Sequence, residues 1–169
     1  MSGLAVESEK RETRQATPGS AHLPALIMNT DIAAQRALDR LEKDGFDALT
    51  DTEKTLATTW LIEAGVRNGG FARFFASDRG NVAFYAPAAL RAIGANQLAG
   101  IAAEANAVFP PAGPPRDHNA RQALVRALDE SKLRTLESLD NRYCTGAEDT
   151  DLLLEVFLAR QTAQAEKRG

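Results

Sequence analysis

Cysteine and histidine are almost missing from this chain of 169 residues, which narrows the chemistry open to it. Cys144 has no second cysteine with which to form an intramolecular disulfide, a composition that fits a reducing compartment. His22 and His118 are the two histidines, and neither has neighbours at a spacing typical of zinc ligands. We therefore expect a cytoplasmic protein without a metal site.

The chain also lacks long apolar segments and an excess of charge of one sign. About 18 consecutive apolar residues would be needed to predict a membrane span, and no such run is present. The formal net charge is −3, too close to neutral to indicate a surface that binds nucleic acid. The arginines at 67, 73, 79 and 91 are too dispersed to change that conclusion. We expect no membrane association and no direct contact with nucleic acid.

Candidate catalytic groups are equally sparse. Cys144 lies in the sequence Tyr-Cys-Thr-Gly, which supplies neither a base nor an orienting group for a nucleophile. His118 follows Asp117 where a helix is expected to begin, and there it is typical of a surface residue. The chain contains no glycine-rich nucleotide loop and no calcium loop. We expect a protein that is not an enzyme and binds no cofactor; titratable groups that converge only in the fold are the alternative.

Helical periodicity fills the chain after its first 28 residues. Residues 1–28 are polar, include Pro18 and Gly19, and contain neither regular periodicity nor the apolar core of a signal peptide, so we expect a disordered tail. Beyond them, apolar residues recur at intervals of three and four, without alternating strands or internal repeats. The predicted fold is all-α: a single compact domain of about seven to eight helices over residues 29–169.

Turn and cap residues divide this domain into its helices. Gly45 is expected to follow the first helix, and Thr50 with Glu53 forms a capping box that opens the second. Leu56, Trp60 and Ala64 are predicted to form the buried stripe of that second helix. Further along the chain we expect a helix that starts near Pro87 and ends at Gly94, a helix over 96–109, and a rigid connection over 110–115. Asp117 is expected to cap a helix with Leu124 and Leu128, and a shorter helix with Leu133, Leu136 and Leu139 follows. The last helix is expected to start at Asp149 or Thr150.

The stretch Asn68-Gly69-Gly70-Phe71 predicts an abrupt junction between two helices. Gly69 is expected in the left-handed conformation that ends the helix over 51–67, and Gly70 is expected to cap the next helix, over 71–77. Phe71, Phe74 and Phe75 share one helical face and would anchor the corner. In the structural interpretation, the glycines and aromatic residues serve the fold alone.

A functional alternative exists for the same junction. Asn68 and exposed backbone N–H groups, with Arg73 or Arg79 nearby, could bind a small anion or the carboxylate of a partner. The protein would then be a small-ligand binding or inhibitory module. An open concave site lined by these side chains would favour that hypothesis.

The junction and several later segments resemble a known family. After Asn68-Gly69-Gly70-Phe71 come Phe74-Phe75, Gly80, the run Ala-Leu-Arg-Ala-Ile-Gly-Ala over 89–95, and Leu-Glu-Ser-Leu-Asp over 136–140 with Tyr143. Over about residues 30–162 this pattern is similar to the DNA-mimic protein family, small all-helical bacterial proteins mostly of unknown function. The resemblance implies a protein that performs no chemistry, with a homodimer as an open alternative. In the member that names the family, carboxylates spaced like duplex phosphates bind a DNA-binding transcription regulator.

The acidic residues are concentrated near the C-terminus. Between residues 129 and 155, eight acids face three basic residues, a local charge of −5. Such a patch attracts a protein surface that normally binds phosphates. Alternatively, these acids favour helix N-termini, and Glu130 with Arg134 is an ordinary surface pair. On the first interpretation another protein, such as a transcription regulator, binds Asp129, Glu130, Glu137, Asp140, Glu148, Asp149 and Asp151.

Overall fold

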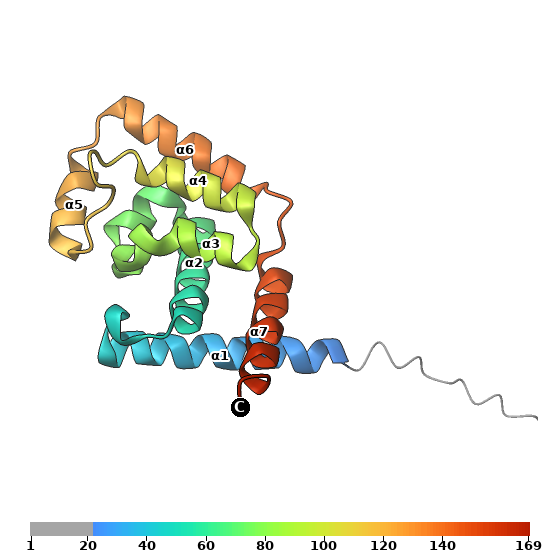
Figure 1. Cartoon of the computed structure of the whole chain (residues 1–169). Helices are drawn as coiled ribbons and strands as arrows, with labels where there is room; N and C mark the ends of the chain where they lie inside the picture. Colours follow the sequence, from blue (N-terminus) through green and yellow to red (C-terminus); the bar gives the residue numbers. More distant parts are fainter. Residues whose placement is uncertain (1–21) are drawn as a thin grey trace, which may run out of the picture.

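The computed structural model describes the backbone of residues 22–169 and the side chains from Asn29 onward. Over this range it contains seven α-helices, two 3-10 helices and no strand, which confirms the all-α prediction (Figure 1). The elements are α1 (His22–Asp44), η1 (Phe46–Ala48), α2 (Asp51–Ala76), η2 (Asp78–Tyr85), α3 (Ala86–Ile93), α4 (Asn96–Asn106), α5 (His118–Arg126), α6 (Glu130–Cys144) and α7 (Thr150–Glu166). Residues 1–21 of the predicted tail lie outside the described part, whereas residues 22–28 belong to α1.

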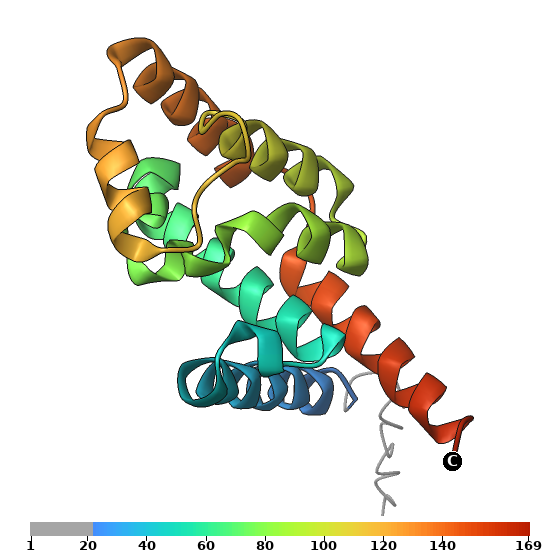
Figure 2. The same cartoon turned by 60° about the vertical axis from the view of Figure 1, so that its left-hand side comes forward.

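The long helix α2 connects the two ends of the molecule. It packs against α1, α3, α5, α6, α7 and η2. Figures 1 and 2 show α1 lying across one end, with α4 and α6 beside each other at the opposite end. From there α7 returns toward α1. Since α2 touches most of the other elements, its side chains are buried around much of its circumference, among them Leu56, Ile62, Val66 and the three phenylalanines.

Most helix boundaries follow the predicted signals. The Thr50 hydroxyl accepts from the Glu53 N–H, and the Glu53 carboxylate accepts from the Thr50 N–H at 2.8 Å, so the capping box is present. Gly94 adopts the left-handed conformation (φ 95°) after α3, and the Asp117 carboxylate accepts from the Ala120 N–H at 2.7 Å. One length was predicted wrongly: α6 has 15 residues against 9 in α5, because it continues through Tyr143.

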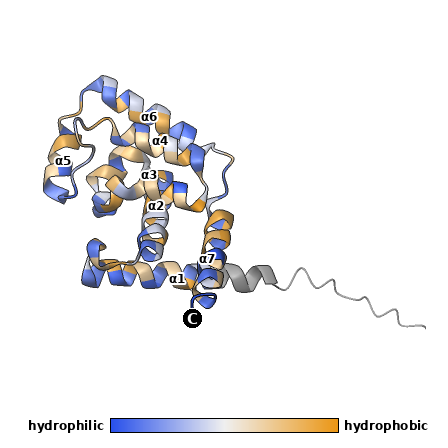
Figure 3. Ribbon diagram, viewed as in Figure 1, coloured by the Kyte–Doolittle hydropathy of each residue, from blue (hydrophilic) through white to orange (hydrophobic). Residues whose placement is uncertain are grey.

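Trp60 is the clearest exception to the predicted core. Its neighbours in the expected stripe, Leu56 and Ala64, are buried and half-buried, but 42% of Trp60 is exposed. The indole lines a hollow that α1 and α7 also border. In Figure 3 the apolar colours of α7 lie mainly on its first turns, whereas its end near the C-terminus is largely hydrophilic. None of the helices within residues 22–169 combines the length and apolar character that a membrane span requires.

Candidate functional site

The Asn-Gly-Gly-Phe stretch bends α2 at Gly70. Gly70 has φ 76° and ψ 172°, a region that only glycine adopts without strain, while the backbone of Gly69 stays out of positive φ. The prediction that Gly69 takes the left-handed position was therefore wrong by one residue. The prediction that Gly70 precedes a new helical segment is confirmed, since helical geometry resumes at Phe71.

A carboxylate from α6 determines at which of the two glycines α2 bends. Asp140 Oδ1 accepts a hydrogen bond of 2.6 Å from the Phe71 N–H, so it caps the second segment of α2. A Cβ atom on Gly70 would lie 2.3 Å from Asp140 Oδ2. Burial raises the pKa of the Asp140 carboxyl. The hydrogen bond from the Phe71 N–H lowers it, and the negative charge of Glu137 raises it further. The anion expected at this helix start is thus supplied by the chain itself.

The aromatic side chains behind the kink form a buried cluster, as predicted. Phe71, Phe74 and Phe75 are each at most 1% exposed, and the Phe71 ring meets Tyr143 of α6 edge-on at 5.5 Å. The Tyr143 hydroxyl donates to Glu63 Oε1 at 2.6 Å. Burial, followed by the charge of Glu63, raises the pKa of the Tyr143 phenol far above its ordinary value. The cluster therefore joins α2 to α6 through both apolar and polar contacts.

A hollow of about 310 Å³ lies beside the kink, on a face of α2 and η2. We call it the kink hollow; its lining residues are Gly65, Asn68, Arg73, Phe74, Ser77, Asp78 and Arg79. Asn68 is exposed and donates one N–H to the Ala64 carbonyl at 2.7 Å. The structure thus brings together the three side chains that the functional alternative required.

Sequence reasoning missed Arg121, the largest fully buried side chain. Its five N–H groups donate to one side-chain amide oxygen and four backbone carbonyls: Asn81, Phe75, Ser77, Pro115 and Arg116. A Cβ on Gly80 would lie 2.7 Å from Arg121 Nε, so the glycine makes room for the guanidinium. Burial lowers the pKa of Arg121, opposed by Asp78 and Asp117. The last carbonyl groups of a helix have no hydrogen-bond partner within it, so the predicted end of the helix near Ser77 could have indicated that a donor from elsewhere in the chain is buried there.

Four of the seven acids predicted to bind a partner cap the starts of helical segments. Asp129 and Asp149 accept from the N–H groups of Lys132 and Leu152 at the starts of α6 and α7. Glu148 accepts from Gln97 and Leu98 at 3.0 and 2.9 Å, which caps α4. With Asp140 at the kink, these carboxylates are occupied by backbone N–H groups. Glu130, Glu137 and Asp151 are the exposed acids that remain from the predicted set.

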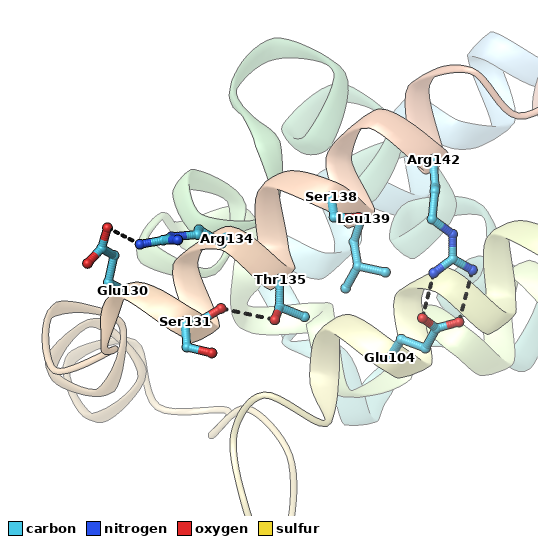
Figure 4. A pocket seen from close by; sticks show the side chains of 8 residues that line it. All are labelled: Glu104, Glu130, Ser131, Arg134, Thr135, Ser138, Leu139 and Arg142. Carbon is cyan, nitrogen blue, oxygen red and sulfur yellow. Dashed lines mark hydrogen bonds and ion pairs between the residues drawn. The ribbon is translucent and has the colours of Figure 1, made fainter.

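Glu130 borders a shallow hollow of about 630 Å³ between α4 and α6 (Figure 4). Its carboxylate pairs with Arg134, and Arg142 holds Glu104 of α4 through bonds of 2.6 and 3.1 Å. The Arg142 hydrogen bonds lower the pKa of Glu104. Since two carboxylates and two guanidinium groups neutralise one another here, this surface is not acidic.

Asp151 lies in a different setting, beside Trp60. The tryptophan hollow has a volume of about 220 Å³ and is lined by Thr30, Asp31, Ala34, Trp60, Asp151, Leu154 and Glu155. Its three carboxylates come from α1 and α7, and the half-exposed indole comes from α2. The sequence did not predict this grouping, because Asp31 and Trp60 lie far from Asp151 along the chain.

The remaining candidate groups do not assemble into a reactive centre within the described residues. His118 is half-buried, with its Nδ1 atom 3.0 Å from Oδ1 of the exposed Asp78, and Cys144 is exposed at the end of α6. Neither lines any of the three hollows described above. Residues 29–169, whose side chains the structure describes, contain no group of three His, Cys, Asp or Glu side chains placed to hold a metal ion.

Comparison with protein families identifies the chain over most of its length. The family model of DMP19-like proteins matches residues 47–161, from η1 into α7. The chain belongs to the DMP19-like protein family. The resemblance to the DNA-mimic protein family stated from the sequence was therefore wrong, although the residues that suggested it lie inside the matched region. Neither the curated proteins nor the solved structures gave a match.

Proposed function

We propose that this DMP19-like protein is a non-catalytic binding module that takes a basic segment of another protein at the tryptophan hollow. The observation that carries the proposal is the placement of the half-exposed Trp60 among Asp31, Asp151 and Glu155. An aromatic face attracts a lysine or arginine head group, and nearby carboxylates add charge-assisted hydrogen bonds. A volume of about 220 Å³ suits one side chain rather than a whole cofactor.

Electrostatics at Asp151 support a cationic occupant. Partial loss of contact with water, followed by the negative charges of Asp149, Glu63 and Asp31, raises the pKa of this exposed residue, and the positive charge of Arg67 opposes the shift. Arg67 itself is held by Glu63 at 2.6 Å. A bound ammonium or guanidinium group would relieve the repulsion and favour the ionised carboxylate. We therefore expect binding to strengthen as the pH rises through the pKa of Asp151.

The tryptophan hollow is a better candidate than the acids of α6 for binding a basic partner. Of the acids in and next to α6 that were predicted to bind a partner, Asp129 and Asp140 cap backbone groups and Glu130 is paired with Arg134; Glu137 is exposed but lines none of the hollows described above. Moving these carboxylates to a partner would break contacts that stabilise the fold. Asp151 and Glu155 form no ion pair within the described residues, so they can bind a partner at lower cost.

The same chemistry suggests what kind of protein the partner is. Surfaces that bind DNA are basic and rich in arginine and lysine, so a DNA-binding protein offers the chemistry that the tryptophan hollow requires. A protein bound in this way could be displaced by duplex DNA, which is the behaviour of a DNA mimic. The net charge of −3 means that such mimicry would rest on a local cluster rather than on the whole surface.

Trp60 provides the test, because it is the single tryptophan of the chain. Its fluorescence is followed during titration with an arginine-rich peptide, and an acidic peptide of equal length serves as the control. We expect a saturable change with the basic peptide that weakens with salt.

Two double variants with the same change in charge locate the site. Asp151→Asn with Glu155→Gln should weaken binding at least about tenfold, which corresponds to 1.4 kcal/mol over two contacts. Glu130→Gln with Glu137→Gln, on α6, should change it less than about twofold. An equal loss in both pairs, or a loss confined to the α6 pair, would refute the proposal.

A further inference from the structure

The kink hollow contains two arginines that have no partner among the described residues. Arg73 and Arg79 both line it, both are exposed, and neither forms a hydrogen bond or an ion pair within residues 29–169. Elsewhere on the surface, Arg67, Arg134 and Arg142 are held by carboxylates, whereas Arg91 and Arg160 also have no partner within residues 29–169 but line none of the hollows described above. We propose that the kink hollow is a second binding site, which takes the phosphate group of a small phosphorylated molecule.

Charge selects a phosphate over a simple carboxylate. A phosphate monoester carries a charge of about −1.5 to −2 at neutral pH and offers three acceptor oxygens, which match two guanidinium groups. The one carboxylate in the lining belongs to Asp78, whose Oδ1 lies 3.0 Å from His118 Nδ1. Asp78 therefore lies beside the His118 imidazole, and its exposed carboxylate is the one negative group in the lining that a bound phosphate would meet.

The remaining lining residues complete a site of limited size. Asn68 uses one amide N–H on the Ala64 carbonyl, which leaves its second N–H and its oxygen for a ligand. Gly65 and the buried Phe74 provide an apolar wall; a Cβ on Gly65 would lie 2.5 Å from the Phe74 ring. A volume of about 310 Å³ is at the lower end of small-molecule sites, so we expect a small monoester rather than a dinucleotide.

The backbone N–H at the kink does not contribute to this site. The sequence suggested that free N–H groups of the junction would hold the anion, but Asp140 already accepts from the Phe71 N–H. Affinity must therefore come from the guanidinium groups and the Asn68 amide. This distinction makes the proposal testable by side-chain substitution without disturbing the kink.

Phenyl phosphate, inorganic phosphate and benzoate are suitable probes, used with the full-length protein labelled with ¹⁵N. We expect saturable NMR shifts of the Asn68 side-chain amide and of the Arg73 and Arg79 Nε–H signals, about nine-tenths complete at about 10 mM for a Kd of about 1 mM. Shifts with both phosphates would assign the site to the phosphate group, and a response to phenyl phosphate alone would assign it to a monoester. Benzoate, with one negative charge, should bind at least about threefold more weakly.

Matched variants decide between a site and general attraction to positive charge. Arg73→Gln with Arg79→Gln should weaken phenyl phosphate binding about tenfold or more, and Asp78→Asn should strengthen it about twofold. Arg91→Gln with Arg160→Gln, two exposed arginines outside the hollow, should leave the Kd unchanged. Equal losses in the two double variants, or no saturable shift at Asn68, would overturn the proposal. Trp60 fluorescence reports the tryptophan hollow separately, so failure at one site is distinguishable from failure at the other.

Discussion

Replacement of each glycine at the kink by alanine should have opposite effects on stability. Gly70 combines φ 76° with ψ 172°, and its added Cβ would lie 2.3 Å from the Asp140 carboxylate. The backbone of Gly69 does not have a positive φ, and a Cβ atom added there would lie 2.5 Å from the Cδ atom of the exposed Arg73 side chain. A flexible side chain can move away, whereas a carboxylate that caps a helix cannot move without loss.

The magnitudes follow from these contacts. Gly70→Ala forces a strained backbone, at about 1–3 kcal/mol, and displaces Asp140 from the Phe71 N–H, at about 1.5–3 kcal/mol. Together we expect a loss of about 2.5–6 kcal/mol in the free energy of unfolding, against a total of about 5–15 kcal/mol for an ordinary domain. Gly69→Ala improves helix propensity by up to about 1 kcal/mol, so its net effect should lie between zero and that gain.

Urea denaturation followed by circular dichroism at equilibrium measures both variants. The pair Gly70→Ala and Asp140→Ala should also be strongly non-additive, because the alanine at residue 70 already removes the carboxylate from its place. If Gly69→Ala destabilised the protein as much as Gly70→Ala, or if the effects at Gly70 and Asp140 simply added, the assignment of the kink would be refuted.

Three further variants test the buried polar contacts. Tyr143→Phe removes the hydrogen bond to Glu63 and should lower the free energy of unfolding by about 1.5–3 kcal/mol in urea; an effect below about 0.5 kcal/mol would contradict it. Arg121→Met leaves carbonyl groups unsatisfied and should cost at least about 3 kcal/mol by the same assay, while the exposed control Arg126→Met should stay within about 0.5 kcal/mol. The pKa of Asp140 in the folded protein is raised above 3.8, so its contribution to stability is largest below that pH and falls as the pH rises through the folded pKa. The wild type should therefore gain stability relative to Asp140→Asn on acidification. A difference between the two proteins that does not depend on pH would refute this.

The helices were predictable because their signals are local. The Thr50 capping box, the left-handed Gly94 and the Asp117 cap each involve residues within about four positions, and all three lie where the sequence indicated. The choice between Gly69 and Gly70 was not local, since it depends on Asp140, 70 positions from Gly70. A capping residue from another helix leaves no periodic trace in the sequence.

The candidate sites show the same division between local and distant information. Asn68, Arg73 and Arg79 are close in sequence, and their common hollow was one of the two expected outcomes. The tryptophan hollow was missed because Trp60 fitted the periodicity of a buried stripe, and three helices had to be placed before its exposure could be known. The helix-start alternative for the acids near α7 was local, but Glu148, in the connection between α6 and α7, caps the distant α4, which the sequence did not indicate.

The most direct test of the proposed function is a comparison of three immobilised proteins in a lysate of the source cells. The wild type, the Asp151→Asn/Glu155→Gln variant and the Glu130→Gln/Glu137→Gln variant are incubated in parallel, and retained proteins are identified before and after elution with duplex DNA. Our account predicts that a basic protein is retained by the wild type and the α6 variant but not by the hollow variant; elution by DNA would add mimicry. Retention of the same proteins by the hollow variant would contradict the account.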